Sequence, residues 1–250
     1  MASRPRARLE RAACAPVLLA VAHGTRDPAG PATVRELVDR VRAVRPWLRV
    51  AEAYAEIAAP PLEDVLADAP GPVVVVPLIL ARGYHAQTDI PGRVVQCRAG
   101  RCSDGGPDAV TARPLGPHAL LAAALADRLG RGRHADAVVL GAAGSSDPAG
   151  LSDVRVAARL LARRLRRPVP YGLVAAGGPA VADVVADARR RGARKVAVAS
   201  YLLAPGYFHG RLLAAEADEV SPPIGAHDAV ARLILRRFDE ASMRARALAG

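Results

Sequence analysis

VLLAVAHGTRDPAG, residues 17–30, is the stretch that decides the fold. It begins with a short run of apolar, partly β-branched residues and is closed by Gly24, Asp27, Pro28 and Gly30, a pattern typical of a buried strand that leaves the core. His23 then stands at the carboxyl end of this strand. In open α/β sheets ligands bind at that edge, because the loops there diverge around a cleft. His23 is therefore the first candidate site residue.

Strand and helix patterns alternate along the rest of the first half. Apolar residues recur at helical spacing from Pro31 to Val44, which predicts a helix. A polar, glycine-containing insertion over 96–107 interrupts the order. The alternation implies a parallel sheet with right-handed crossovers. The further elements that the patterns predict are strands over 50–57, 73–80 and 110–113 and helices over 61–69 and 117–129.

Two more polar side chains follow predicted strands and join His23 as candidates. His85 lies just past the strand over 73–80, and Glu56 ends the strand over 50–57. Two neutral imidazoles at an open site suit a borderline divalent ion such as Fe, Co, Ni or Zn, or act as proton acceptors near neutral pH. Purely structural histidines and a solvated strand-end carboxylate are the alternatives. We predict His23, His85 and Glu56 as catalytic residues, with His23 and His85 as metal ligands.

The second half of the chain repeats the first. Because three motifs recur in the same order, and the first two at nearly the same offset, we infer a duplicated α/β unit. We therefore predict an α/β fold of two similar lobes, each a parallel sheet flanked by helices, with a cleft between them. The matching pairs of segments are 22–30 with 142–150, 79–84 with 202–207, and 115–118 with 224–227.

The two halves differ at the histidines. His23 corresponds to Ala143, and His85 corresponds to Phe208, with His209 one residue out of register. The loss falls on the two residues that are placed for chemistry. We expect an active N-terminal lobe and a degenerate, supporting C-terminal lobe.

Composition and the repeat set the domain boundaries. Residues 1–15 form a basic tail, because the apolar run after Arg11 is too short to span a bilayer and continues into the first strand. The N-terminal lobe takes residues 16–130 and the C-terminal lobe residues 131–250. We expect a cytoplasmic protein.

Other side chains are candidates for binding a ligand. Arg26 and Arg82 lie close in sequence to the predicted cleft, as does Arg113, and guanidinium groups hold carboxylates through paired hydrogen bonds. Tyr84 recurs as Tyr207 in the second half, which favours cleft lining or packing over chemistry. We assign Arg26, Arg82 and Tyr84 to ligand binding, with surface arginines as the alternative.

Two recurring histidines are given a structural role. His118 and His227 each follow a glycine by two residues and stand beside a predicted helix start. For both we favour capping or packing.

The overall composition bears on whether the protein binds nucleic acid, a membrane or a small molecule. The chain of 250 residues is 51% hydrophobic and can bury a substantial core, while its 3% aromatic content provides few stacking platforms for nucleic acid. The formal charge of +11 comes almost wholly from arginine, with Lys195 the one lysine, and is scattered. This positive charge is as consistent with a small anionic substrate as with a nucleic acid or a membrane surface. We expect neither of the latter.

Several familiar motifs are missing from the sequence. It contains no GxGxxG, P-loop, HExxH or GxSxG motif, so nucleotide-dependent transfer, zincin and serine-hydrolase chemistry have no support. Cys97 and Cys102 could form a disulfide or hold a metal, but no second pair completes a structural zinc site. Inert thiols are the simpler interpretation.

Three segments carry a family resemblance: LLAVAHGTRDPAG (18–30), VVVVPLILARGYHAQTDIP (73–91) and ARPLGPH (112–118). With them the chain resembles the sirohydrochlorin chelatase family in its two-lobed form, which includes cobalt chelatases of cobalamin synthesis and iron chelatases of sirohaem synthesis. GYHxxxDIP at a strand end, paired with an upstream HG, is the specific feature. The similarity covers nearly the whole chain apart from the tail and the insertion.

The resemblance implies two parallel α/β lobes with His23 and His85 in the intervening cleft and an acidic partner at Glu56. It implies an ATP-independent lyase that inserts Fe²⁺ or Co²⁺, with Ni²⁺ in the same class, into a sirohydrochlorin-type tetrapyrrole. The metal is a substrate, and no organic cofactor is expected. The alternative is a carrier that binds metal or tetrapyrrole without turnover. Because single-lobed relatives build the cleft by dimerising, we expect a monomer with internal pseudo-two-fold symmetry.

Overall fold

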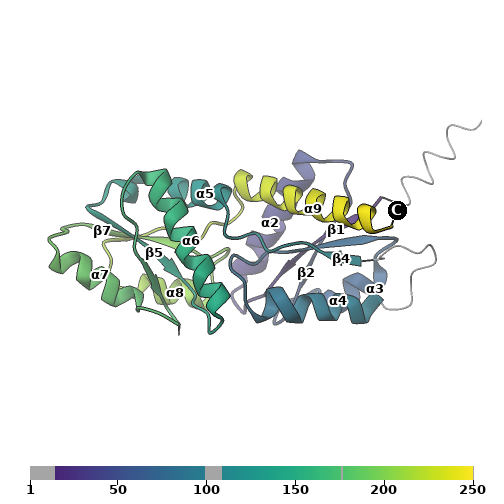
Figure 1. The fold of residues 1–250 in the computed structure, drawn as a ribbon, viewed down its shortest axis with the longest axis horizontal. Coiled ribbons are helices and arrows are strands. Elements are labelled where there is room, and N and C mark those ends of the chain that lie inside the picture. The colour runs from purple at the N-terminus through teal and green to yellow at the C-terminus, as the bar shows by residue number, and fades with distance from the viewer. Residues whose placement is uncertain (1–14, 99–108, 176, 250) are drawn as a thin grey trace, which may run out of the picture.

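The computed structural model describes residues 15–98, 109–175 and 177–249 as two α/β lobes placed end to end (Figure 1). Most of the expected basic tail, most of the expected insertion, Cys14 and Cys102 lie outside these residues, so the choice of inert thiols over a pairing of Cys97 with Cys102 stays a prediction. No described helix is long and apolar enough to cross a membrane.

The N-terminal sheet has the strand order β2-β1-β3-β4, with every neighbouring pair parallel. Strand β1 lies between its neighbours and is buried along its whole length, as its apolar sequence predicts. Alternate β1 side chains point to opposite faces, Leu18 into one core cluster and Leu19 into another. The strands are β1 (Val17–Ala22), β2 (Val50–Tyr54), β3 (Val73–Pro77) and β4 (Ala109–Thr111).

Helices cover both faces of this sheet. They are α2 (Ala29–Val44), α3 (Leu62–Asp68) and α4 (Ile90–Arg98), and one turn of π-helix, η1 (His85–Asp89), leads into α4. Strands β2 and β3 end about three residues earlier than the sequence predicted. The regular pairing with β1 ends at Tyr54 and Pro77, and beyond them only single backbone hydrogen bonds continue, from Ala55 and Glu56 to Ala22 and His23 and from Leu78 to Val21.

The C-terminal sheet repeats this arrangement with the order β6-β5-β7-β8, again parallel throughout. The identical strand order in two sheets confirms the predicted α/β fold of two similar lobes. The elements are β5 (Ala137–Ala142), β6 (Tyr171–Leu173), β7 (Val196–Tyr201) and β8 (Glu219–Val220), with helices α6 (Pro148–Leu165), α7 (Val181–Arg190) and α8 (Tyr207–Leu213).

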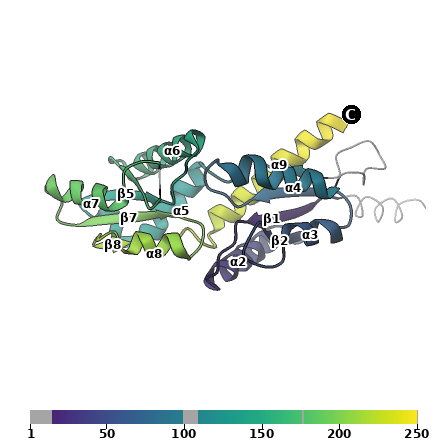
Figure 2. The same ribbon diagram turned by 90° about the horizontal axis from the view of Figure 1, so that it is seen from below.

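The two halves of the chain exchange a helix. Helix α5 (Ala119–Leu129) ends the first repeat but packs on α6 and β7 of the C-terminal sheet, whereas α9 (Asp228–Ala249) packs on α2 and β3 of the N-terminal sheet (Figures 1 and 2). The short 3₁₀-helix η2 (Gly130–His134) follows α5. The expected boundary at residue 130 therefore separates two sequence repeats, while each lobe in space contains a helix from the other repeat.

Both exchanged helices begin at a histidine that caps them. The Nδ1 atom of His118 accepts from the Leu120 N–H at 3.1 Å, and that of His227 accepts from the Ala229 N–H at 3.1 Å. Burial lowers the pKa of His118, with nearby arginines adding to the effect, which favours the neutral ring that an accepting nitrogen requires. The preferred capping role of both residues is confirmed.

A buried acid in α6 holds the loop that follows β3 across the boundary between the lobes. Asp153, whose side chain is only 4% exposed, accepts from the Arg82 backbone N–H at 2.7 Å and from its guanidinium at 2.7 and 3.0 Å. The Tyr201 hydroxyl donates to the Leu80 carbonyl in the same loop at 2.7 Å. This loop leads directly into His85.

Asp153→Ala is expected to lower the free energy of unfolding by about 1–3 kcal/mol, because the backbone N–H and the guanidinium of Arg82 lose a buried, charged acceptor. Urea denaturation followed by circular dichroism measures it. The matched control is Asp239→Ala, which removes a pair with Arg45 of similar geometry but with a more exposed carboxylate. Its expected cost is below about 1 kcal/mol, and equal losses in the two variants would contradict the greater role of the buried pair.

Candidate functional site

Two adjoining cavities lie between the lobes, where the sequence predicted a cleft. Their volumes are about 570 Å³ and about 330 Å³. The larger lies between the loop after β1 and the loop after β7, and the smaller lies between the loop after β3 and the loop after β5. The residues that line both cavities are His23, Leu78, Leu202, Leu203 and Phe208.

The larger and smaller cavities are related by the internal repeat. Residues 22–25 line the larger cavity, and their counterparts 142–145 line the smaller one. Residues 202–208 of the larger cavity likewise correspond to 79–85 of the smaller one. Where corresponding residues of the two repeats differ in chemical type, the two cavities therefore differ in the groups that line them.

Gly24 fixes the relation between His23 and Glu56. Its φ is +100°, a value that glycine adopts readily and other residues rarely do. A Cβ at this position would clash with the Glu56 carbonyl oxygen, which would lie 1.9 Å away. The backbone N–H of Glu56 donates to the carbonyl of His23 at 2.9 Å. The chain leaving β1 is thus held directly against the chain leaving β2, and the two side chains emerge from adjacent positions.

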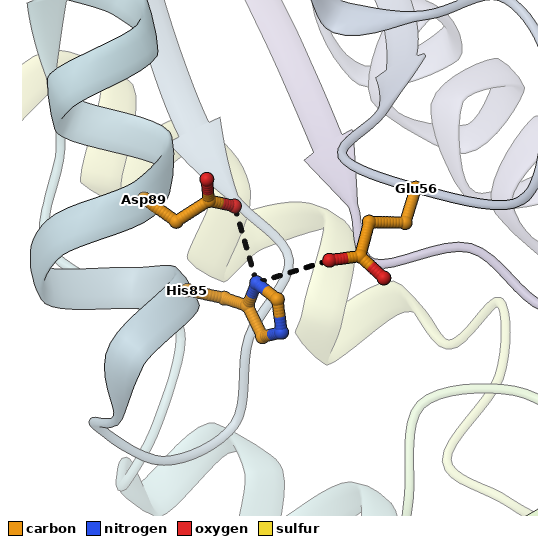
Figure 3. A group of neighbouring side chains, drawn as sticks. All are labelled: Glu56, His85 and Asp89. Atoms are coloured by element: carbon orange, nitrogen blue, oxygen red, sulfur yellow. Dashed lines mark hydrogen bonds and ion pairs between the residues drawn. The ribbon is translucent and has the colours of Figure 1, made fainter.

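His85 lies between two carboxylates. Its Nδ1 atom is 3.1 Å from the Oδ2 atom of Asp89 and 3.9 Å from the Oε1 atom of Glu56 (Figure 3). One potential ligand atom from each of the three residues lies within 4.8 Å of the others. Figure 3 shows both carboxylates directed at the same ring nitrogen, with the second nitrogen pointing away from them.

The ring of His23 lies beside that of His85. Their centroids are 4.5 Å apart, with a tilt of 38° between the planes. The Nδ1 atom of His23 is buried and has no hydrogen-bond partner among the described residues. Buried polar atoms without a partner are uncommon and call for an explanation such as a ligand or a catalytic role. The structure therefore brings together the three residues predicted as catalytic, His23, His85 and Glu56.

Asp89 was missed by the sequence analysis, although it lies in the GYHxxxDIP motif. The i,i+4 spacing from His85 was the signal, because residues so spaced face each other on a helix. Arg93, one turn further on, approaches Asp89 at 3.6 Å and donates to the Ala55 carbonyl at 2.7 Å. It also hydrogen-bonds to Glu63, which lowers the pKa of that carboxyl. Arg93 thus links Asp89 to the end of β2.

The C-terminal lobe has lost the whole group. Its backbone repeats the contact between His23 and Glu56, because the Ala175 N–H donates to the Ala143 carbonyl at 2.9 Å. Alanines therefore replace both residues. Phe208 replaces His85, and at the same offset the buried Leu212 replaces Asp89. A polar group with metal-binding donors exists on one side of the cleft, and its counterpart is apolar.

The predicted ligand-binding residues have different surroundings. Arg26 is exposed and lines the larger cavity. Arg82 lines the smaller one, with its guanidinium paired to Asp153. Tyr84 is exposed there and meets the His85 ring edge-on at 5.5 Å. Arg113 lines neither cavity and pairs with Glu240 of α9 at 2.9 Å, so its predicted position near the cleft is wrong.

Comparison with protein families identifies the repeat. The CbiX family model matches residues 17–131 and again residues 137–241. The chain belongs to the CbiX family. No curated protein sequence matches this CbiX-family chain significantly.

Solved structures share the two-lobed fold of this CbiX-family protein. SirB from Bacillus subtilis with Fe³⁺ is 24% identical, with a TM-score of 0.73 over 90% of this chain and 94% of that one. SirB from Bacillus subtilis subspecies spizizenii, in complex with cobalt, is 22% identical, with a TM-score of 0.74 over 92% and 97%. CbiX, the terminal enzyme of siroheme biosynthesis in denitrifying bacteria, is 22% identical, with a TM-score of 0.64 over 90% and 99%.

Asp89→Asn is expected to weaken Co²⁺ binding about 10- to 100-fold, the usual effect of losing a carboxylate that ligates a metal or orients a metal-binding histidine. Titration of the protein with Co²⁺, followed by visible absorption, measures it. Asp147→Asn is the matched control, because Asp147 caps α6 in the other lobe and asparagine also caps well. Unchanged Co²⁺ affinity in Asp89→Asn would remove Asp89 from the site.

Proposed function

We propose that this protein is a sirohydrochlorin chelatase, which inserts Fe²⁺ or Co²⁺ into the tetrapyrrole without ATP. The observation that carries the proposal is the group formed by His23, His85, Glu56 and Asp89 on one wall of a cleft between two lobes. Membership of the CbiX family supports it. So does the likeness to SirB, described with Fe³⁺ and with cobalt.

The chemistry requires a metal donor and a proton acceptor side by side. A divalent ion enters the ring as two pyrrole N–H protons leave, so charge balances without a nucleotide or an organic cofactor. His85, Glu56 and Asp89 offer one imidazole and two carboxylates, a mixed set that borderline divalent ions accept. His23, whose ring lies beside that of His85 and which lines both cavities, offers a second imidazole as the proton acceptor.

The cleft supplies the binding energy. A flat ring must be deformed so that its nitrogen lone pairs face the incoming ion, and walls built on two stiff sheets can favour that shape over the flat one. Arg26 on the larger cavity is the exposed cation placed to meet a substrate carboxylate. Ni²⁺ belongs to the same ligand class, and the donor set does not discriminate among these ions.

We further propose a cytoplasmic monomer. The two CbiX repeats in one chain support the monomer, because the chain itself brings both walls of the cleft together. The shared strand order of the two sheets supports the pseudo-two-fold symmetry.

A carrier that binds metal or tetrapyrrole without turnover is the competing function. Stopped-flow absorption of sirohydrochlorin mixed with Co²⁺ or Fe²⁺ under anaerobic conditions separates the two. A chelatase accelerates the spectral change at catalytic protein concentration, whereas a carrier leaves it at the uncatalysed rate. The latter result would overturn the proposal.

His85→Ala is expected to reduce the rate of metal insertion by at least about 10²-fold, since His85 lies next to each of the other proposed metal-site residues, His23, Glu56 and Asp89. His209→Ala is the matched control, because His209 also lines the cleft, on the larger cavity rather than the smaller one, and it hydrogen-bonds to the Ser221 carbonyl. Circular dichroism checks that both variants fold. Full activity in His85→Ala, or equal losses in the two, would contradict the assigned site.

A further inference from the structure

Large apolar side chains are exposed on the walls of the cleft. Of the nine exposed large hydrophobic residues in the described part of the chain, four line the two cavities. Exposed apolar surface gathered in one concave region marks a binding site for an apolar group. The four are Ile57, Tyr84, Tyr207 and Phe208.

Ile57 differs from the others in its backbone. Its φ is +67°, in the left-handed region, where a β-branched residue is a true outlier. The N–H of Ala58 donates to the carbonyl of Glu56 at 2.6 Å, so Ile57 is the central residue of a three-residue turn. Such γ-turns with positive φ are rare and strained.

Packing does not explain this isoleucine. The residue is 60% exposed, so its side chain contributes little to the core. Glycine or asparagine would form the same turn at lower cost, because both tolerate positive φ. Strained residues of this kind cluster where a ligand is held. Ile57 directly follows Glu56 of the metal-binding group, and its side chain lines the larger cavity.

We propose that Ile57 is a substrate-contacting residue, whose side chain packs on the apolar face of the conjugated macrocycle in the larger cavity. The strained turn presents this side chain next to Glu56, so the residue positions the ring beside the metal-binding group. Tyr207 and Phe208 form the facing apolar wall from the other lobe. This inference rests on the proposed function for the identity of the ring.

Substitution at Ile57 is expected to move stability and affinity in opposite directions. Ile57→Asn relieves the turn and raises the unfolding temperature by about 1–4 °C. It also removes apolar contact, so the KM and the Kd for sirohydrochlorin rise about 10-fold while kcat changes little. Ile57→Leu keeps an apolar side chain and retains wild-type KM. A residue with a merely structural role would not separate these readouts.

Arg166→Asn is the matched control for strain. Arg166 has a φ of +56° at the end of α6 and lines neither cavity. Its substitution is expected to raise the unfolding temperature without changing KM or Kd.

The experiment measures ring binding by absorption titration separately from metal insertion. Unchanged Kd in Ile57→Asn, or a lowered unfolding temperature, overturns the inference whether or not the wild type turns over. A wild type that binds the ring through Ile57 but inserts no metal supports the contact and overturns the proposed function. A wild type that does not bind the ring overturns both.

Discussion

The missing side chain at Gly24 is the constraint on which the site depends. It lets the chain leaving β1 lie against the carbonyl of Glu56, closer than any other residue would allow. Because β1, β2 and β3 are parallel neighbours, the chain segments that follow them leave from one edge of the sheet. His23 and Glu56 are then adjacent, and the turn before α4 brings His85 to both. Backbone geometry thus places the proposed metal ligands side by side.

The degenerate lobe shows how a duplicated fold divides its tasks. Its sheet keeps the strand order and the backbone bond between Ala143 and Ala175, so the architecture survives without the chemistry. What this lobe supplies instead is support. Asp153 accepts a hydrogen bond from the backbone of Arg82, in the loop just before His85. Phe208 lines both cavities. The ion pair from Asp153 has no counterpart at Thr33, its repeat partner, whose hydroxyl donates within α2.

Strand ends and the repeat were predictable from sequence because they depend on local patterns. The apolar run before His23 and the one before His85 each indicate a buried strand, and parallel strands must share an edge. Contacts across the sequence were not predictable in this way. Asp153 lies 71 residues from Arg82 and is an ordinary helical aspartate in the sequence. Asp89 could have been predicted as a site residue, because its i,i+4 spacing from His85 is a local signal in the sequence.

Periodicity also could not tell which sheet a helix covers. The apolar stripes of α5 and α9 fit either lobe, and only the structure shows that each helix crosses to the other one. This exchange has an evolutionary consequence. If each repeat once existed as a separate chain, the same crossing between two copies would have been a domain swap, and fusion of the genes would have made the swap permanent. Neither half would then be a self-sufficient folding unit, since each would leave bare the sheet face that its neighbour's helix now covers.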